Sequence, residues 1–121
     1  AKLIEYLEKK QINTFYWVPS VMNFVASTDT LSLLKNKYLK KILFAGEVMP
    51  CKTLNYWRRH LPDALFCNLY GPTEITITCT YYIVNREFAD NEHLPIGVPC
   101  RNANVFVLDD NIKTIYTRGT K

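Results

Sequence analysis

The sequence predicts an α/β fold with a parallel β-α-β-α-β core, followed by mixed or antiparallel strands. Over the first 70 residues, short apolar runs alternate with amphipathic helical segments, which is typical of parallel strands joined by helical crossovers. The connections between these segments are short, as in compact α/β units. After residue 76 the pattern changes to polar–apolar alternation with no long helix following, which indicates antiparallel pairing.

Four helical segments are expected in the first half of the chain. Each is supported by apolar residues at helical spacing or by a residue type that commonly begins a helix. The supporting residues are Leu3, Ile4 and Leu7 in 2–11; Val21, Phe24 and Val25 after Pro19 and Ser20; Thr30 before a short helix through Leu34; and Leu54, Trp57 and Leu61 after Pro50.

Strands are expected where aromatic, β-branched or aliphatic residues run between turn signals. The expected ranges are 14–18, 42–45, 64–70 and 78–84. A terminal hairpin is expected from 104–108 and 113–116, because the sequence Asp109-Asp110-Asn111 between them is typical of a turn.

Length and composition set the limits for this chain. Its 121 residues fit one domain or a piece of one, and it begins in a helical pattern without an initiator methionine, so we expect 1–121 to be a single partial domain. No apolar stretch approaches the roughly 20 residues of a membrane span, and a cytoplasmic location is expected. The cysteines at 51, 67, 79 and 100 lack CxxC spacing, which favours reduced thiols over a metal site.

Positive charge is concentrated in the first half of the chain. Residues 1–63 contain ten Lys or Arg against five Asp or Glu, whereas residues 64–121 contain five against six. No nucleic-acid partner is expected, because the clustered cations lack interleaved aromatics and a binding motif. A non-catalytic binding or scaffold module with a basic helical face is the alternative function. Its cations would be Lys35, Lys37, Lys40, Lys41, Arg58 and Arg59.

The segment NLYGPTE, residues 68–74, places polar groups directly after an apolar strand. Ligands of parallel α/β sheets bind beyond the carboxyl ends of the strands, and Gly46 and Glu47 follow the preceding strand in the same way. If the two strands are neighbours, both ends line one crevice. Tyr70 offers a face on which a purine can stack, and the Asn68 amide suits an adenine edge.

The rest of the segment suits a phosphate group. Gly71 lets the backbone turn and approach a ligand closely. Thr73 can donate a hydrogen bond to a phosphate oxygen, and Glu74 is a hard oxygen ligand of the kind that Mg²⁺ takes together with phosphates. A purely structural alternative is a tight turn in which Glu74 caps the start of a helix.

NLYGPTE resembles the core motif of the amino-acid-adenylating branch of the adenylate-forming enzymes. That branch includes the adenylation domains of non-ribosomal peptide synthetases and the stand-alone D-alanine–carrier protein ligases. Three further segments resemble the same family in order and spacing and extend the resemblance over essentially the whole chain. They are FYWVPS, ILFAGEVMP and LPIGVPCRNANVFVLDD.

The resemblance implies a two-step reaction. ATP and an amino-acid carboxylate give an aminoacyl-adenylate, which then passes its acyl group to the phosphopantetheine thiol of a carrier protein. It implies that Tyr70 stacks on adenine, that Asn68 and the Gly46–Glu47 turn border the base, and that Thr73 and Glu74 serve as catalytic residues at the α-phosphate and Mg²⁺. The family's catalytic lysine lies outside this chain, so the 121 residues alone are expected to be inactive, and exposed sheet edges are expected to promote self-association.

The resemblance also implies an amino-acid pocket. The matching positions are all uncharged, which favours a small or medium uncharged amino acid as the substrate. The D-alanine ligases usually carry Cys where this chain has Ala45, so their substrate is not implied for this chain. The positions of the implied pocket are Tyr16, Leu43, Ala45, Leu69, Ile77 and Thr78.

Overall fold

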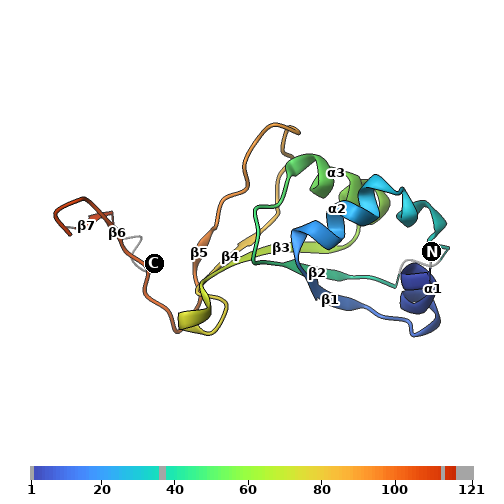
Figure 1. Ribbon diagram of the computed structural model, residues 1–121, viewed down its shortest axis with the longest axis horizontal. Helices are drawn as coiled ribbons and strands as arrows, with labels where there is room; N and C mark the ends of the chain where they lie inside the picture. The colour runs from blue at the N-terminus through green and yellow to red at the C-terminus, as the bar shows by residue number, and fades with distance from the viewer. Residues whose placement is uncertain (1, 36–37, 113, 117–121) are drawn as a thin grey trace.

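A five-stranded sheet, in the order β1-β2-β3-β4-β5, organises the chain (Figure 1). The structure is a computed structural model that describes residues 2–35, 38–112 and 114–116. The first three strands pair in parallel and the last two join antiparallel, so the predicted α/β fold with its change of sheet type is confirmed. The strands are β1 (Thr14–Trp17), β2 (Lys41–Phe44), β3 (Leu65–Tyr70), β4 (Thr80–Ile83) and β5 (Val98–Pro99).

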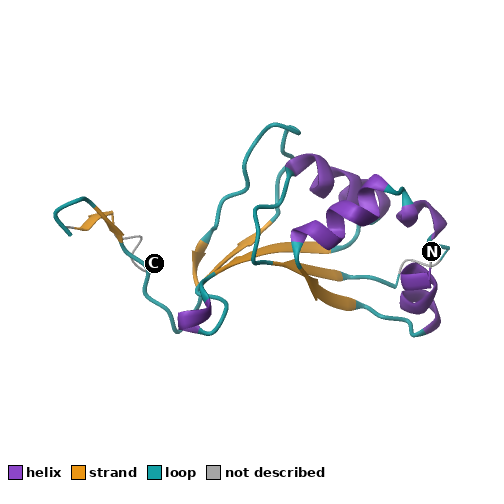
Figure 2. Cartoon of the chain, viewed as in Figure 1, coloured by secondary structure: helices purple, strands orange, loops and turns teal. Residues whose placement is uncertain are grey.

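Helices cover one face of this sheet. Figure 2 shows α2 and α3 together over the sheet, where they occupy the crossovers between β1 and β2 and between β2 and β3. Alternate strand residues point to this face, and Phe15, Ile42 and Phe66 are buried there in register. The helices are α1 (Lys2–Lys9), α2 (Pro19–Ser27) and α3 (Cys51–His60), with short 3-10 turns η1 (Thr30–Leu33) and η2 (Thr73–Ile75).

Trp57 is the centre of the core between α3 and its neighbours. Its side chain is fully buried, and its indole N–H donates a hydrogen bond of 3.0 Å to the Met22 carbonyl on α2. The Phe15 ring of β1 meets it edge to face with ring centroids 5.5 Å apart. The predicted α3 stripe is confirmed, since Leu54 and Leu61 are buried beside it. One aromatic residue therefore joins both crossover helices to the sheet.

The buried face of α2 differs from the predicted one. Val25 is buried as expected, but Phe24 is 67% exposed and Val21 is also exposed, while Met22 and Pro19 face the core. Apolar residues occur around most of this helix, so their spacing alone does not select the buried side. The predicted Thr30 cap is wrong as well, because η1 follows Asp29 and no side chain caps it.

The C-terminal hairpin forms, though it is shorter than predicted. β6 (Val107–Leu108) pairs antiparallel with β7 (Thr114–Tyr116), and residues 104–106 are not in a strand. Lys113, predicted to begin the second strand, lies outside the described residues. The hairpin lies away from the main sheet (Figure 1), and both β6 side chains are exposed. The edge strand β5 was not predicted, because it is two residues long and contains a proline.

Candidate functional site

The carboxyl ends of β2 and β3 lie side by side and enclose a cavity of about 280 Å³. Of the six residues predicted to bind the nucleotide, five line it and only Thr73 does not. The predicted crevice between the two strand ends therefore exists in the structure. Its lining residues are Gly46, Glu47, Val48, Met49, Asn68, Leu69, Tyr70, Gly71, Leu94 and Ile96.

The turn after β2 forms one wall of the cavity. Gly46 has φ of +91°, a conformation that side-chain-bearing residues rarely adopt, so the turn needs glycine here. The next residue, Glu47, directs its carboxylate at Ser20 on α2 and accepts hydrogen bonds from the Ser20 backbone N–H and hydroxyl, at 2.8 and 3.0 Å. The Glu47 side chain is thus bound to the protein itself, while the turn that it belongs to faces the cavity.

A second wall comes from a loop far along the chain. Asn68, only 9% exposed, donates a side-chain hydrogen bond of 2.9 Å to the carbonyl of Pro95. This bond holds the 94–97 loop against β3, and Leu94 and Ile96 of that loop line the cavity. Gly97 lets the same loop lie close to β4, because a Cβ there would be 1.9 Å from the Tyr81 carbonyl oxygen. One amide N–H of Asn68 is therefore already engaged by the chain.

The end of β3 and the tight loop that follows it form the third part of the site. Tyr70 is 51% exposed and lines the cavity. A Cβ on Gly71 would lie 2.6 Å from the Ile77 carbonyl oxygen, so the returning backbone packs directly on this glycine. Thr76 and Ile77 both have positive φ, at +62° and +76°, which is a strained conformation for β-branched residues. Strain of this kind is concentrated at functional sites.

Thr73 and Glu74 lie outside the cavity lining, in the exposed turn η2. The purely structural alternative for Glu74 is only half right: a short 3-10 turn does begin after Pro72, but no side-chain hydrogen bond caps it. The exposed Glu74 carboxylate is a suitable ligand for Mg²⁺, which binds through one or two carboxylates and completes its shell with phosphate oxygens and water. Among the described residues, no three His, Cys, Asp or Glu side chains gather into a metal site.

Four of the six predicted amino-acid pocket residues share one face of the sheet. Tyr16 pairs with Leu43, and Leu69 follows Cys67, the partner of Leu43, by two positions on β3. Ala45 continues the alternation of β2, so its side chain points the same way, opposite the helices. Ile77 and Thr78 lie instead in the loop that returns over Gly71. Only Leu69 of the six also lines the cavity.

Sequence reasoning missed four lining residues: Val48, Met49, Leu94 and Ile96. All four fall in segments that carry the family resemblance, ILFAGEVMP and LPIGVPCRNANVFVLDD, so the sequence contained a signal for them. The four cysteines are free thiols, and burial raises the pKa of the Cys67 thiol on β3, which favours its neutral and unreactive form.

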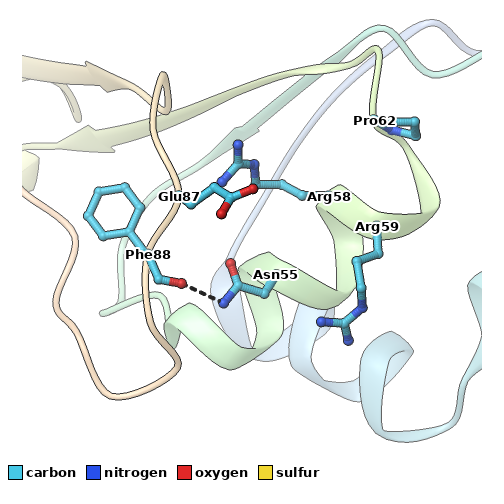
Figure 3. Close-up of a pocket in the computed structure, with 6 residues that line it drawn as sticks. All are labelled: Asn55, Arg58, Arg59, Pro62, Glu87 and Phe88. Carbon is cyan, nitrogen blue, oxygen red and sulfur yellow. Dashed lines mark hydrogen bonds between the residues drawn. The ribbon is translucent and has the colours of Figure 1, made fainter.

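A larger pocket of about 380 Å³ lies on α3 and the loop after β4 (Figure 3). It contains part of the basic face, Arg58 and Arg59. The amide of Asn55 donates to the Phe88 carbonyl at 2.9 Å, and Arg58 donates to the Arg86 carbonyl at 2.8 Å. The other cations predicted for this face are exposed near the start of β2, except Lys37, which lies outside the described residues.

Comparison with known proteins identifies the family. The family model described as "AMP-binding enzyme" matches residues 1–120. The chain belongs to the AMP-binding enzyme family. It is 36% identical over 119 residues to the L-proline–[L-prolyl-carrier protein] ligase of Streptomyces coelicolor, covering 97% of this chain and 22% of that protein. It is 34% identical to the D-alanine–D-alanyl carrier protein ligase of Listeria innocua, covering 96% of this chain and 23% of that protein.

The solved structures agree on the fold. The NRPS protein PA1221, which contains adenylation and PCP domains, superimposes with a TM-score of 0.81 at 22% identity, over 94% of this chain and 19% of that one. The chain thus spans about a fifth of the length of these relatives. Membership of an enzyme family favours the ligase hypothesis over the scaffold alternative. No described helix is long and apolar enough to cross a membrane.

Proposed function

We propose that the protein carrying this chain is an ATP-dependent ligase that activates an amino acid and loads it onto a carrier protein. In the first step the amino-acid carboxylate attacks the α-phosphate of ATP, forming the aminoacyl-adenylate and releasing pyrophosphate. In the second step the phosphopantetheine thiol of the carrier protein attacks the acyl carbon and displaces AMP. ATP as a substrate also supports the cytoplasmic location expected from the sequence.

The single observation that carries this proposal is the cavity between the ends of β2 and β3. Five residues with the chemistry of a purine site converge there from segments that lie 20 or more residues apart. Tyr70 is 51% exposed, enough for its ring to stack on adenine, and Gly46 and Gly71 line the same cavity without side chains of their own. The two carrier-protein ligases among the relatives support the carrier protein as partner.

In this proposal, the η2 turn acts on the phosphates. Thr73 donates its hydroxyl hydrogen to an oxygen of the α-phosphate, and Glu74 ligates Mg²⁺ from the same turn. Bound Mg²⁺ would neutralise part of the charge on the phosphate oxygens. Because Thr73 and Glu74 supply only part of such a site, residues 1–121 alone are proposed to show no pyrophosphate exchange.

The amino-acid side chain is proposed to lie against Tyr16, Leu43, Ala45 and Leu69 on the face opposite the helices, with Ile77 and Thr78 closing the pocket. No charged group is present among these residues to pair with a charged substrate, so the substrate is a small or medium uncharged amino acid. The relatives named for proline and D-alanine both take such amino acids, which supports this substrate class.

Pyrophosphate exchange by the intact protein, with a panel of amino acids, tests the proposal. Exchange is expected to depend on ATP and to be strongest with a small or medium uncharged amino acid. Strongest exchange with glutamate or lysine would contradict the pocket assignment, and absence of exchange with every amino acid would contradict the ligase itself.

A matched pair of variants on β3 tests the pocket assignment. Leu69→Ala removes a proposed pocket side chain and is expected to raise the KM for the amino acid about tenfold. Leu65→Ala makes the same change at the other end of the strand, far from the cavity, and is expected to leave this KM unchanged. Equal effects from both would place the pocket elsewhere.

A further inference from the structure

The Glu47–Ser20 pair joins two segments that lie 27 residues apart in the sequence. The carboxylate accepts one hydrogen bond of 2.8 Å from the Ser20 backbone N–H and one of 3.0 Å from the Ser20 hydroxyl. Ser20 is in the first turn of α2, where backbone N–H groups have no partner within the helix. The N-cap residue of this helix, Val18, supplies no side-chain hydrogen bond to it. Glu47 therefore takes the place of a local cap from a distant turn.

This contact has electrostatic as well as geometric support. A carboxylate at the beginning of a helix is stabilised by the helix dipole, and a hydrogen bond to a charged acceptor is stronger than one to a neutral acceptor. The two turns also pack together, since Val18 lies 3.7 Å from the position that a Cβ on Gly46 would occupy. The Glu47 carboxylate is therefore oriented by the chain, although Glu47 belongs to the cavity lining.

The two segments that the pair joins border different parts of the proposed site. The 46–49 turn forms a wall of the cavity at which the adenine is proposed to bind. Ser20 closely follows β1, whose Tyr16 belongs to the proposed amino-acid pocket. The pair thus connects the nucleotide side of the site to the end of the strand that contributes to the amino-acid side.

We infer that Glu47 is a positioning residue that holds the 46–49 turn in the shape that receives the nucleotide. The inference rests on the proposed function. Without the carboxylate, the turn around Gly46 gains conformations that do not bind, because glycine restricts its backbone least of all residues. ATP affinity then falls in proportion to the population of the competent shape, while the chemical step on bound ATP is unaffected.

The test uses Glu47→Ala, Glu47→Gln and Ser20→Ala in the intact protein, with ATP affinity and the kcat of pyrophosphate exchange measured for each. Glu47→Ala is expected to weaken ATP binding roughly tenfold, as the loss of hydrogen bonds to a charged group implies. Glu47→Gln keeps one acceptor oxygen and Ser20→Ala keeps the backbone donor, so each is expected to weaken ATP binding about threefold. The kcat at saturating ATP is expected to stay within about twofold of the wild type.

A double variant makes the test specific to the pair. In a protein that already carries Glu47→Ala, adding Ser20→Ala is expected to cause no further loss of ATP affinity, because the shared contact is already gone. Glu5→Gln, an equivalent change of an exposed residue on α1, is the control and should leave ATP affinity unchanged. Should Glu47→Ala fail to fold, Glu47→Gln and Ser20→Ala, alone and combined, still measure the contact.

Three outcomes overturn the inference. They are unchanged ATP affinity in the Glu47 variants, additive losses in the double variant, and a fall in kcat with normal ATP affinity, which would assign Glu47 to the chemistry instead. Each is distinguishable from failure of the proposed function, which would appear as a wild-type protein without exchange activity.

Discussion

The two cavities of this molecule differ in the groups that line them, and their volumes do not reveal this difference. The larger one, about 380 Å³, contains Arg58, Arg59 and Glu87 and looks better suited to a charged ligand. The smaller one, about 280 Å³, lies at the strand ends and has Glu47 as its one ionisable side chain besides the Tyr70 phenol. Volume and charge together would therefore select the larger cavity and not the one proposed to bind ATP.

The difference lies in which groups are available to a ligand. In the larger cavity, Asn55 donates to both the Phe88 carbonyl and the Asp90 carboxylate, and Arg58 donates to the Arg86 carbonyl. These bonds hold the 85–92 loop on α3. The smaller cavity is lined by two glycines and the half-exposed Tyr70, while the side chains of Glu47 and Asn68 bind other segments of the chain. The larger cavity is thus a packing interface between a helix and a loop, whereas the smaller one is lined by the residues proposed to bind ATP.

The strongest test of this distinction compares Glu74, in the η2 turn that closely follows the lining residue Gly71, with Glu87 in the lining of the larger cavity. Glu74→Gln in the intact protein is expected to lower the kcat of pyrophosphate exchange by about a hundredfold, because a group that offsets charge at the reacting phosphate is lost. Glu87→Gln makes the same change in the larger cavity and is expected to leave kcat unchanged. Normal turnover in Glu74→Gln, or an equal loss in Glu87→Gln, would reverse the assignment of the two regions.

Tyr70 tests the smaller cavity alone. Tyr70→Ala is expected to weaken ATP binding by roughly 1–3 kcal/mol, the range for an aromatic side chain stacked on a base. Tyr70→Phe retains the ring and is expected to bind ATP almost normally. Equilibrium binding of ATP to the two intact variants separates the possibilities, since equal losses would assign the contact to the hydroxyl rather than to the ring.

The larger cavity is expected to respond through stability instead of activity. Asn55→Ala removes the hydrogen bonds to Phe88 and Asp90, at 2.9 and 2.8 Å, and is expected to lower the free energy of unfolding by about 1–2 kcal/mol. The KM and kcat of exchange should remain as in the wild type. Denaturant unfolding and steady-state kinetics of the same preparation provide both measurements. A changed KM with unchanged stability would indicate a second ligand site at this cavity.

The smallest expected effect concerns Glu92, which closes the 85–92 loop. The Arg86 guanidinium at 3.0 Å, and then the Ala89 N–H, hold the pKa of the Glu92 carboxyl below its ordinary value. A lowered folded-state pKa contributes stability above the unfolded pKa, and this contribution is lost as the pH falls through the folded value. Glu92→Gln is therefore expected to lower the thermal midpoint at neutral pH but not in strong acid. An equal difference at both pH values would show that the ion pair contributes nothing.

Local sequence predicted much of the site. The run at 64–70 followed by Gly71 and Pro72 predicted a strand that stops at a tight turn, and the structure has β3 end at Tyr70. Gly46 after an apolar run predicted the equivalent end of β2. Strong local preferences act at both places, because glycine permits backbone angles that other residues avoid, and apolar runs are buried in parallel sheets. The backbone conformation of Ile77 could not be predicted in this way. Its positive φ is imposed by the loop, against the preference of a β-branched residue.

The sequence by itself determined the α/β class, the order of the helices and strands from α1 to β4, and the two glycine turns that flank the cavity. Each of these depends on preferences of neighbouring residues, which the order of side chains records directly. Only the tertiary structure decided which face of α2 is buried, and that Leu94 and Ile96 complete the cavity. It also decided that the Glu47 carboxylate holds Ser20, 27 residues away. Such contacts arise when the sheet closes and the helices dock, and their energies depend on distances between segments that local sequence does not encode.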